Sequence, residues 1–537
     1  MKKFLTVALV ALLIAAQSLA ACTIFAVGKD ATVDGSTMTS HTCDSNGDDL
    51  RLWLIPSMEA GYERDVVLSG RKNADYGNFP EVKDYGTNGM VLGTYTFEED
   101  TNQYLHAMYS IINEKGLAMG ESTCSRDRSD KNANTLKALF DAAEGMYDCY
   151  MLQDLALECC DTAREAVEFM GAILDEYGWN GTAECINICD GDEAWVFEAY
   201  GGNYWVAIRV PDDALFVAAN RCRIDVFYEN DPDNYLYHKG IKEDALANGL
   251  WDGKGEFQPC KAYAPNDDFN KNSGCILREW RAMSLLNAEA AATMDLYGDP
   301  NDFPLFIVPD EKVSVAKIHE VCSDYYAGTE FDCSRTVQSG DFGDPMNPNN
   351  VWRPINMFRA TYVQIANVKS WLPDEAKCLV WVGWGAPITT YLTPVFASSN
   401  ELSPQFGIGV RAEYDENSGW WVAQELQQTA RINFNDAIKE VRAVRDPKMA
   451  QYYKETAIMQ EAAAEMIEAG MTTQAVNLLT TYQNNVANDW HETYKALTDK
   501  LTCKYMNDLV SFKVPSNSQW WKDIVNENIG DGLKPLN

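Results

Sequence analysis

At residues 19–28 the chain reads Leu19-Ala20-Ala21-Cys22-Thr23-Ile24-Phe25-Ala26-Val27-Gly28, and the rest of the sequence can be understood by working outward from this run. A β-prone segment, residues 23–27, follows Cys22 at once. If the chain is cut just before Cys22, that residue carries both a thiol and a free α-amine. An α-amine has a reference pKa of about 7.7–8.0, so part of it is unprotonated near neutral pH. Cys22 would then be a nucleophile with its own base.

The segment before Cys22 has the features of a secretion signal. Lys2 and Lys3 provide a charged start, residues 4–16 are apolar, and residues 18–21 offer small side chains for cleavage. The apolar run is short for a bilayer, and no later run of about 20 apolar residues occurs in the sequence. We therefore expect a signal peptide at residues 1–21. The mature protein should be exported (periplasmic, extracellular or at the cell surface) without spanning a membrane.

The composition is that of an ordinary globular protein with an acidic surface. Of the 537 residues, 46% are hydrophobic, which supports a large core and argues against global disorder. Lysine and arginine total 44 against 79 aspartates and glutamates, a formal net charge of −35. Such a surface repels phosphate backbones, so we expect no nucleic-acid partner.

The 15 cysteines do not by themselves indicate a metal site. An exported chain permits disulfides, but their pairing cannot be read from the sequence. A buried thiol can also pack as a small hydrophobic group. Cys185 and Cys189 lie four residues apart with no histidine nearby, so a zinc site is not expected there. We predict that the protein needs no metal and no organic cofactor.

A β-hairpin is predicted immediately after Cys22. Residues 28–30 and 34–35 are rich in turn-forming side chains, and residues 36–42 have a second β-prone pattern. The first strand would begin at Cys22, and the second would end near Asp44. Side chains at the end of the second strand would then lie beside Cys22.

Strand and helix patterns follow one another through the central region. Residues 106–112 and 117–124 favour strands, and Thr162 with Glu165 forms a capping box at the start of a helix. Four further β-prone runs separated by turns predict an antiparallel meander, at residues 184–189, 194–199, 204–210 and 215–220. This order predicts a layered α+β fold, and we assign its body to residues 22–430.

The last part of the chain, residues 431–537, is predicted to be helical. Asp446 has the character of a helix cap and Pro447 suits the first helical position, so we expect a helix from here to Gly470. A second helix is indicated by apolar residues at spacings of three and four: Leu479, Tyr482, Val486, Trp490, Tyr494, Leu497 and Leu501. We therefore predict a C-terminal helical hairpin packed on the body.

Three interpretations of Cys22 compete. Residues 19–22 also suit the signal that is cleaved before the lipid-carrying cysteine of bacterial lipoproteins, and an acylated amine could not act as a base. A lipid anchor usually needs a polar and flexible tether, however, whereas residues 23–27 enter a strand directly. This favours a catalytic terminus over an anchor. The third interpretation, a plain half-cystine, stays open.

Residues 22–36, with residues 40–44 behind them, resemble the start of the N-terminal-nucleophile (Ntn) cysteine dipeptidases, the family of lactic-acid bacterial dipeptidase A. Bile-salt and penicillin V amidases are more distant relatives. Further similar segments run in the family's order, at residues 112–123, 192–198, 216–224 and 278–282, so the resemblance covers roughly residues 22–400. It implies an Ntn-hydrolase αββα sandwich, self-exposure of Cys22 and hydrolysis of dipeptides.

The resemblance also implies roles for further residues, by position. Asp44 would hold the α-amine, and Arg278 would favour the thiolate. Asn220 would offer its side-chain amide to the oxyanion, and Thr123 falls where the amidases keep a second oxyanion group. His41 stands where the amidases have an arginine, so its role is open. Each of these residues alone would have an ordinary structural explanation, such as a turn at Asn220.

The predicted reaction is acyl transfer from a small peptide substrate to the thiol of Cys22. A dipeptide must be held by both charged ends, and Arg221 and Arg223 are candidates for such a clamp. One alternative is an amidase of the same fold that acts on N-acyl amino acids or bile-salt-like amides. The other is a lipid-anchored binding protein without catalysis. The oligomeric state stays open, a homo-oligomer included.

Overall fold

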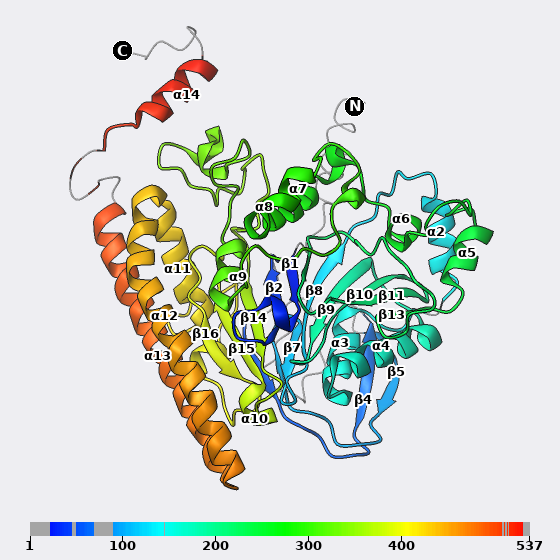
Figure 1. Cartoon of the computed structure of the whole chain (residues 1–537). Helices are drawn as coiled ribbons and strands as arrows, with labels where there is room; N and C mark the ends of the chain where they lie inside the picture. Colours follow the sequence, from blue (N-terminus) through cyan, green and yellow to red (C-terminus); the bar gives the residue numbers. More distant parts are fainter. Residues whose placement is uncertain are drawn as a thin grey trace.

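The structure is a computed structural model of the whole chain, and it describes residues 22–45, 50–68, 90–143, 145–506, 510, 513 and 515–529. The predicted signal peptide, residues 1–21, lies outside these residues. Helices and sheets both contribute extensively, so the predicted α+β class is confirmed (Figure 1). None of the described helices is long and apolar enough to cross a membrane.

The first strand, β1 (Thr23–Val27), begins directly after Cys22 and pairs antiparallel with β2 (Thr37–Cys43). Thr23 lies opposite Thr42, so the predicted hairpin is confirmed. In this register Cys22 lies beside the end of β2, as predicted from the sequence.

Six antiparallel strands form the sheet that contains the hairpin. In spatial order they are β12 (Leu215–Ala218), β1, β2, β14 (Tyr362–Val368), β15 (Leu379–Trp384) and β16 (Thr393–Phe396). Every residue in these strands is buried. Continuous burial of this kind is typical of a sheet covered on both faces.

A second antiparallel sheet packs against the first. In spatial order its described strands are β13 (Tyr235–Tyr237), β11 (Tyr204–Arg209), β10 (Ala194–Gly201), β9 (Ala183–Cys189), β8 (Ala118–Cys124), β7 (Ser110–Asn113), β6 (Tyr104–His106) and β3 (Trp53–Ile55). A separate ribbon consists of β4 (Glu63–Leu68) and β5 (Met90–Thr96).

The predicted meander is wrong in its fourth strand. Residues 215–220 do not continue the second sheet, because their strand β12 pairs with β1 in the first sheet. The edge of β11 that it would have used is occupied by β13 instead.

Buried amide side chains tie the two sheets together. Asn187 on β9 donates to the backbone carbonyls of Phe25, at 2.6 Å, and Ser40, at 3.0 Å. Gly120 on β8 allows this close approach, because a Cβ there would lie 2.6 Å from Oδ1 of Asn187 and 3.0 Å from Cβ of His41. The two sheets therefore lie close together at Gly120.

Helices cover the outer face of each sheet, which gives the layer order helix, sheet, sheet, helix (Figure 1). The second sheet is covered by α3 (Cys149–Cys159) and α4 (Ala163–Tyr177), and the first by α9 (Val315–Cys322), α11 (Gly419–Arg431), α12 (Phe434–Glu468) and α13 (Thr472–Tyr505). The predicted capping box of Thr162 and Glu165 starts α4.

The other described helices are shorter or lie at the ends of the layers. They are α2 (Ala133–Phe140), α5 (Ile241–Ala247), α6 (Pro259–Tyr263), α7 (Phe269–Leu286), α8 (Ala288–Thr293), α10 (Asp374–Lys377) and α14 (Gln519–Ile529). Short 3-10 turns occur at Lys29–Ala31, Pro300–Asp302, Cys333–Arg335, Val337–Ser339 and Pro404–Phe406. Of these helices, α7 matters most for the site, because it contacts β12 next to Cys22.

The predicted C-terminal hairpin is formed by α12 and α13, and the whole apolar stripe of α13 is buried. The predicted start at Asp446 is wrong, because α12 begins at Phe434 and Pro447 lies inside it. An internal proline costs a helix about 3 kcal/mol. Buried contacts before the proline, among them Ile438 and Val441, stabilise the longer helix. The domain boundary between residues 430 and 431 stays a prediction.

Candidate active site

Cys22 places its thiol inside the protein, with 1% of the residue exposed. The thiol donates a hydrogen bond to Oε1 of Glu121 on β8, 3.1 Å away. The backbone N–H of Asp44 also faces the sulfur and favours the thiolate. Burial first, and then the negative charge of Glu121, raise the pKa of the thiol well above its ordinary value. The thiol is therefore protonated in the uncut chain.

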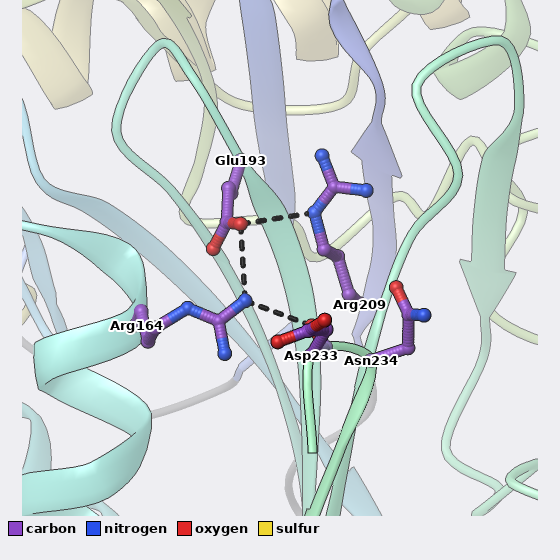
Figure 2. A pocket seen from close by; sticks show the side chains of 5 residues that line it. All are labelled: Arg164, Glu193, Arg209, Asp233 and Asn234. Atoms are coloured by element: carbon purple, nitrogen blue, oxygen red, sulfur yellow. Dashed lines mark hydrogen bonds and ion pairs between the residues drawn. The ribbon is translucent and has the colours of Figure 1, made fainter. Parts of the chain in front are cut away.

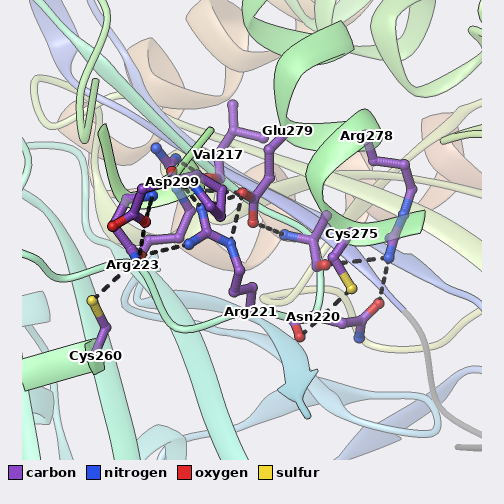
Figure 3. Close-up of polar contacts among 12 residues, drawn as sticks. Val217, Asn220, Arg221, Arg223, Cys260, Cys275, Arg278, Glu279 and Asp299 are labelled. Carbon is purple, nitrogen blue, oxygen red and sulfur yellow. Dashed lines mark hydrogen bonds and ion pairs between the residues drawn. The ribbon is translucent and has the colours of Figure 1, made fainter. Parts of the chain in front are cut away.

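Arg278 on α7 fixes the backbone at Cys22. Its buried guanidinium donates through Nη1 to the carbonyl oxygen of Cys22, at 2.7 Å, and to Oγ1 of Thr23, at 2.9 Å. Figure 3 shows the other arm of Arg278 reaching Asn220, where Nη2 lies 2.7 Å from Oδ1. The structure thus brings both predicted residues to the beginning of β1. These bonds go to the carbonyl group and not to the sulfur, so the effect of Arg278 on the thiolate stays a prediction.

Asn220 stands just after β12 with a φ of 63°, a left-handed conformation that asparagine adopts more readily than most residues. Its backbone N–H donates to Oγ of Ser122, at 2.8 Å, and its Nδ2 donates to the carbonyl oxygen of Thr123, at 2.7 Å. An amide nitrogen carries two hydrogens, and the bond to Thr123 uses one of them. The second hydrogen suits the predicted oxyanion role.

Asp44, at the end of β2, is completely buried. Its Oδ2 lies 3.3 Å from Nη2 of Arg353. Burial raises the pKa of Asp44 to about 6, although Arg353, Arg278 and Arg359 act in the opposite direction. The second carboxylate oxygen, Oδ1, makes no hydrogen bond to any residue that the structure describes. Buried acceptors usually have a hydrogen-bond donor, so this oxygen indicates that a donor is missing in the uncut chain.

His41 and Thr123, the two other predicted residues, converge on Glu121. Nε2 of His41 lies 3.2 Å from Oε1 of Glu121, and Oγ1 of Thr123 donates to Oε2 over the same distance. The rings of Tyr109 and Tyr362 pack edge-on against His41, each with its centroid 5.5 Å away. All six predicted site residues therefore lie around the beginning of β1, together with a glutamate that the sequence analysis missed.

Glu121 and Glu184, on neighbouring strands, form a buried pair of carboxyl groups. Burial alone would raise the pKa of Glu121, but His41, Glu184 and Cys22 lower it to about 2. Burial and the charge of Glu121 raise the pKa of Glu184 well above its ordinary value. The pair thus carries one negative charge, on Glu121. In the sequence, Glu121 is marked only as an acidic residue within an otherwise uncharged strand, residues 118–124.

The thiol of Cys22, the imidazole of His41 and the carboxylate of Glu121 each offer an atom that can bind a metal ion, and these atoms lie within 4.8 Å of one another. Sulfur, nitrogen and oxygen donors together suit zinc. The geometry thus permits a metal site at a place where the sequence predicts none.

Arg221 and Arg223 do not fit the predicted role as a clamp for the substrate. Nη2 of Arg221 lies 2.7 Å from Oε2 of Glu279, and its Nη1 lies 2.6 Å from Oδ1 of Asn301. Arg223 donates to the backbone carbonyl of Val217 (Figure 3). Both guanidinium groups hold the loop after β12 in place, so their function is structural.

A surface cavity of about 380 Å³ lies away from these residues (Figure 2). It is lined by Arg164, Glu193, Arg209, Asp233 and Asn234. Both arginines lie 3.1 Å from Oε1 of Glu193, so their charges are already paired. None of the predicted site residues lines this cavity.

Comparison with known proteins adds to the geometry. Residues 21–446 match the profile of Peptidase family C69. A probable dipeptidase of Latilactobacillus sakei is 26% identical over 90% of this chain and 94% of its own length. A probable dipeptidase of Salmonella dublin is 24% identical over 75% of this chain and 87% of its own length. Dipeptidase A of Lactobacillus helveticus is also 24% identical, over 81% of this chain and 86% of its own length. The matched region contains every site residue described above.

Proposed function

This chain belongs to peptidase family C69 and hydrolyses peptide bonds, and from that premise we propose that it is an exported dipeptidase with Cys22 as its nucleophile. The relationship expected from residues 22–44 is thereby confirmed at the level of the family. The relatives are named dipeptidases, which supports peptides of two residues as substrates.

The proposal requires that residues 1–21 be removed, so that Cys22 becomes the first residue. The observation that carries it is Oδ1 of Asp44, a buried carboxylate oxygen that has no hydrogen-bond partner among the described residues and lies at the same end of the hairpin. The α-amine of a newly formed terminus would supply the missing donor. Two facing sheets between helical layers are the architecture expected of an Ntn hydrolase, which supports the same assignment.

In the proposed reaction the α-amine, directly or through one water molecule, takes the proton of the Cys22 thiol. The thiolate attacks the peptide carbonyl carbon, a carbon–sulfur bond forms, and the oxygen becomes negatively charged. Donors such as the second N–H of Asn220 stabilise this charge, and losing such a donor typically lowers turnover about 10²–10³-fold. The carbon–nitrogen bond then breaks, and the protonated amine gives its proton to the leaving amino group. Water hydrolyses the thioester and restores the thiol.

The test compares substrates and variants of the exported protein. We expect hydrolysis of dipeptides and no hydrolysis of N-acyl amino acids, and Cys22→Ser should lower the rate about 10³-fold or more while the protein stays folded. Cleavage of the acyl substrates alone would favour the amidase of the same fold. An unchanged rate in the Cys22→Ser variant would exclude this nucleophile. Inactivity together with a diacylglycerol adduct in the intact mass would indicate a lipid-anchored binding protein.

A further inference from the structure

Glu121 has no part in the reaction described above, yet it touches the nucleophile. Its carboxylate is completely buried, and Oε1 lies 3.1 Å from the sulfur of Cys22. Activated cysteines normally lie beside a cation, because a neighbouring anion opposes formation of the thiolate. Burying an ionised carboxylate is also costly unless a charged or polar partner compensates for the lost water. The position of Glu121 therefore needs an explanation.

Among the described residues, Glu121 forms no ion pair with a lysine or an arginine, and hydrogen bonds and His41 stabilise its charge. Thr123 donates to Oε2, and His41 lies 3.2 Å from Oε1, the oxygen that also accepts from Cys22. Glu184 holds a proton that it shares with Glu121, so it adds a hydrogen bond but no positive charge. Oε1 of Glu184 has no hydrogen-bond partner among the described residues. The guanidinium of Arg278 is bound to oxygens of Cys22, Thr23 and Asn220.

We propose that Glu121 binds the α-ammonium group of the substrate, and that the protein therefore acts on peptides with a free amino terminus. This rests on the proposed function, since it takes Cys22 as the nucleophile. In a dipeptide the ammonium nitrogen is attached to the carbon next to the scissile carbonyl. When that carbonyl approaches the sulfur to about 3–3.5 Å, a carboxylate touching the sulfur is within hydrogen-bond reach of the ammonium group.

The same contact links binding to activation. The bound ammonium group neutralises Glu121, so the charge that opposes ionisation of the Cys22 thiol disappears in the complex. The nucleophile thus becomes more reactive when a correct substrate is present. A peptide with an acetylated amino terminus brings no cation, so the buried carboxylate gains no charged partner and continues to oppose formation of the thiolate.

The test compares L-alanyl-L-alanine with its N-acetyl derivative. For the wild-type protein we expect kcat/KM to be about 10²-fold or more in favour of the free dipeptide, and Glu121→Gln should abolish most of this preference by lowering the rate on the free dipeptide and not the rate on the acetylated one. Glu184→Gln is the matched control, because it replaces a neutral carboxyl with a neutral amide on the same pair. That variant should keep the preference.

Thiol ionisation provides a second readout that a purely structural glutamate would not change. Alkylation of Cys22 by iodoacetamide, followed by mass spectrometry across pH, should give a lower apparent thiol pKa in Glu121→Gln than in the wild-type protein. If the variant does not fold, wild-type protein with and without saturating L-alanine gives the same test, and the amino acid should lower the thiol pKa. A wild-type enzyme that cleaves both peptides equally well, or a Glu121→Gln variant that loses both activities equally, would overturn the inference alone. Failure to cleave either peptide would overturn the proposed function with it.

Discussion

Two buried clusters of charged side chains meet at the end of β12, and they are built differently. Around Arg221 the charges are matched, because Nε and Nη2 both bond to Oε2 of Glu279, at 3.1 Å and 2.7 Å. Around Cys22 they are not. Asp44 keeps a carboxylate oxygen without a partner among the described residues, and Glu121 places a negative charge beside a thiol. Arg221 and Glu279 satisfy each other, as stability requires, whereas the second cluster leaves groups for a chain terminus and a substrate.

The largest effect is expected from a change in the unmatched cluster. Asp44→Asn removes the carboxylate that would hold the α-amine, while the amide fills the same space. We expect kcat on a dipeptide to fall about 10³-fold, because the amine is then no longer positioned as the base. Steady-state kinetics measure the loss, and circular dichroism checks that the fold is retained. An unchanged kcat would mean that Asp44 is an ordinary residue of a strand end.

A change in the matched cluster should act on stability. Glu279→Gln leaves the guanidinium of Arg221 buried without its counter-charge, and we expect the free energy of unfolding to fall by about 3–5 kcal/mol. Urea denaturation measures the change. The control is Glu193→Gln in the partly exposed ion-pair network of Figure 2, where the cost should stay below about 1 kcal/mol. Equal effects of the two substitutions would contradict a stabilising role for the buried pair of Arg221 and Glu279.

In contrast to Glu279, ionised Asp44 should lower the stability of the fold, and the pH dependence of stability should show this. Its pKa is raised to about 6 in the folded, uncut chain, against about 3.9 for an unfolded aspartate. Between these values the folded state binds more protons than the unfolded state, so the contribution of Asp44 to stability is lost as the pH rises from about 4 to about 6. Asp44→Asn should remove this decline and stabilise the uncut chain at pH 7 by on the order of 3 kcal/mol. Thermal melts at about pH 4 and about pH 6 test this. A steeper decline of stability with pH in the variant than in the wild-type chain would contradict it.

The smallest expected effect is that of metal removal. Cys22, His41 and Glu121 could bind zinc, but the proposed reaction needs only the thiol and the amine. Dialysis against EDTA should therefore leave the dipeptidase rate unchanged. If EDTA abolished the activity and added zinc restored it, the cluster around Cys22 would be a metal centre.

Local chemistry allowed part of this molecule to be predicted from its sequence. The hairpin after Cys22 and the capping box of Thr162 and Glu165 depend on neighbouring residues, and both are confirmed. The same local rules failed at Pro447, where buried contacts of the preceding turns outweigh a helix-start signal.

Long-range pairing explains what the sequence could not reveal. Nothing in residues 215–218 indicates that they join β1 and not β11, because both choices bury the same apolar side chains. Glu121 was missed for a related reason. Its contact with Cys22 spans 99 residues and depends on how closely the two sheets approach at Gly120. The resemblance to a known family supplied Asp44, Asn220 and Arg278, which spacing alone would not have singled out.

The most direct test is to determine the mass and the amino-terminal sequence of the exported, active protein. We expect a chain that begins at Cys22, with an unmodified thiol and a free α-amine. A fully active protein that begins at Ala21 or earlier, or one that carries a lipid on this sulfur, would contradict it.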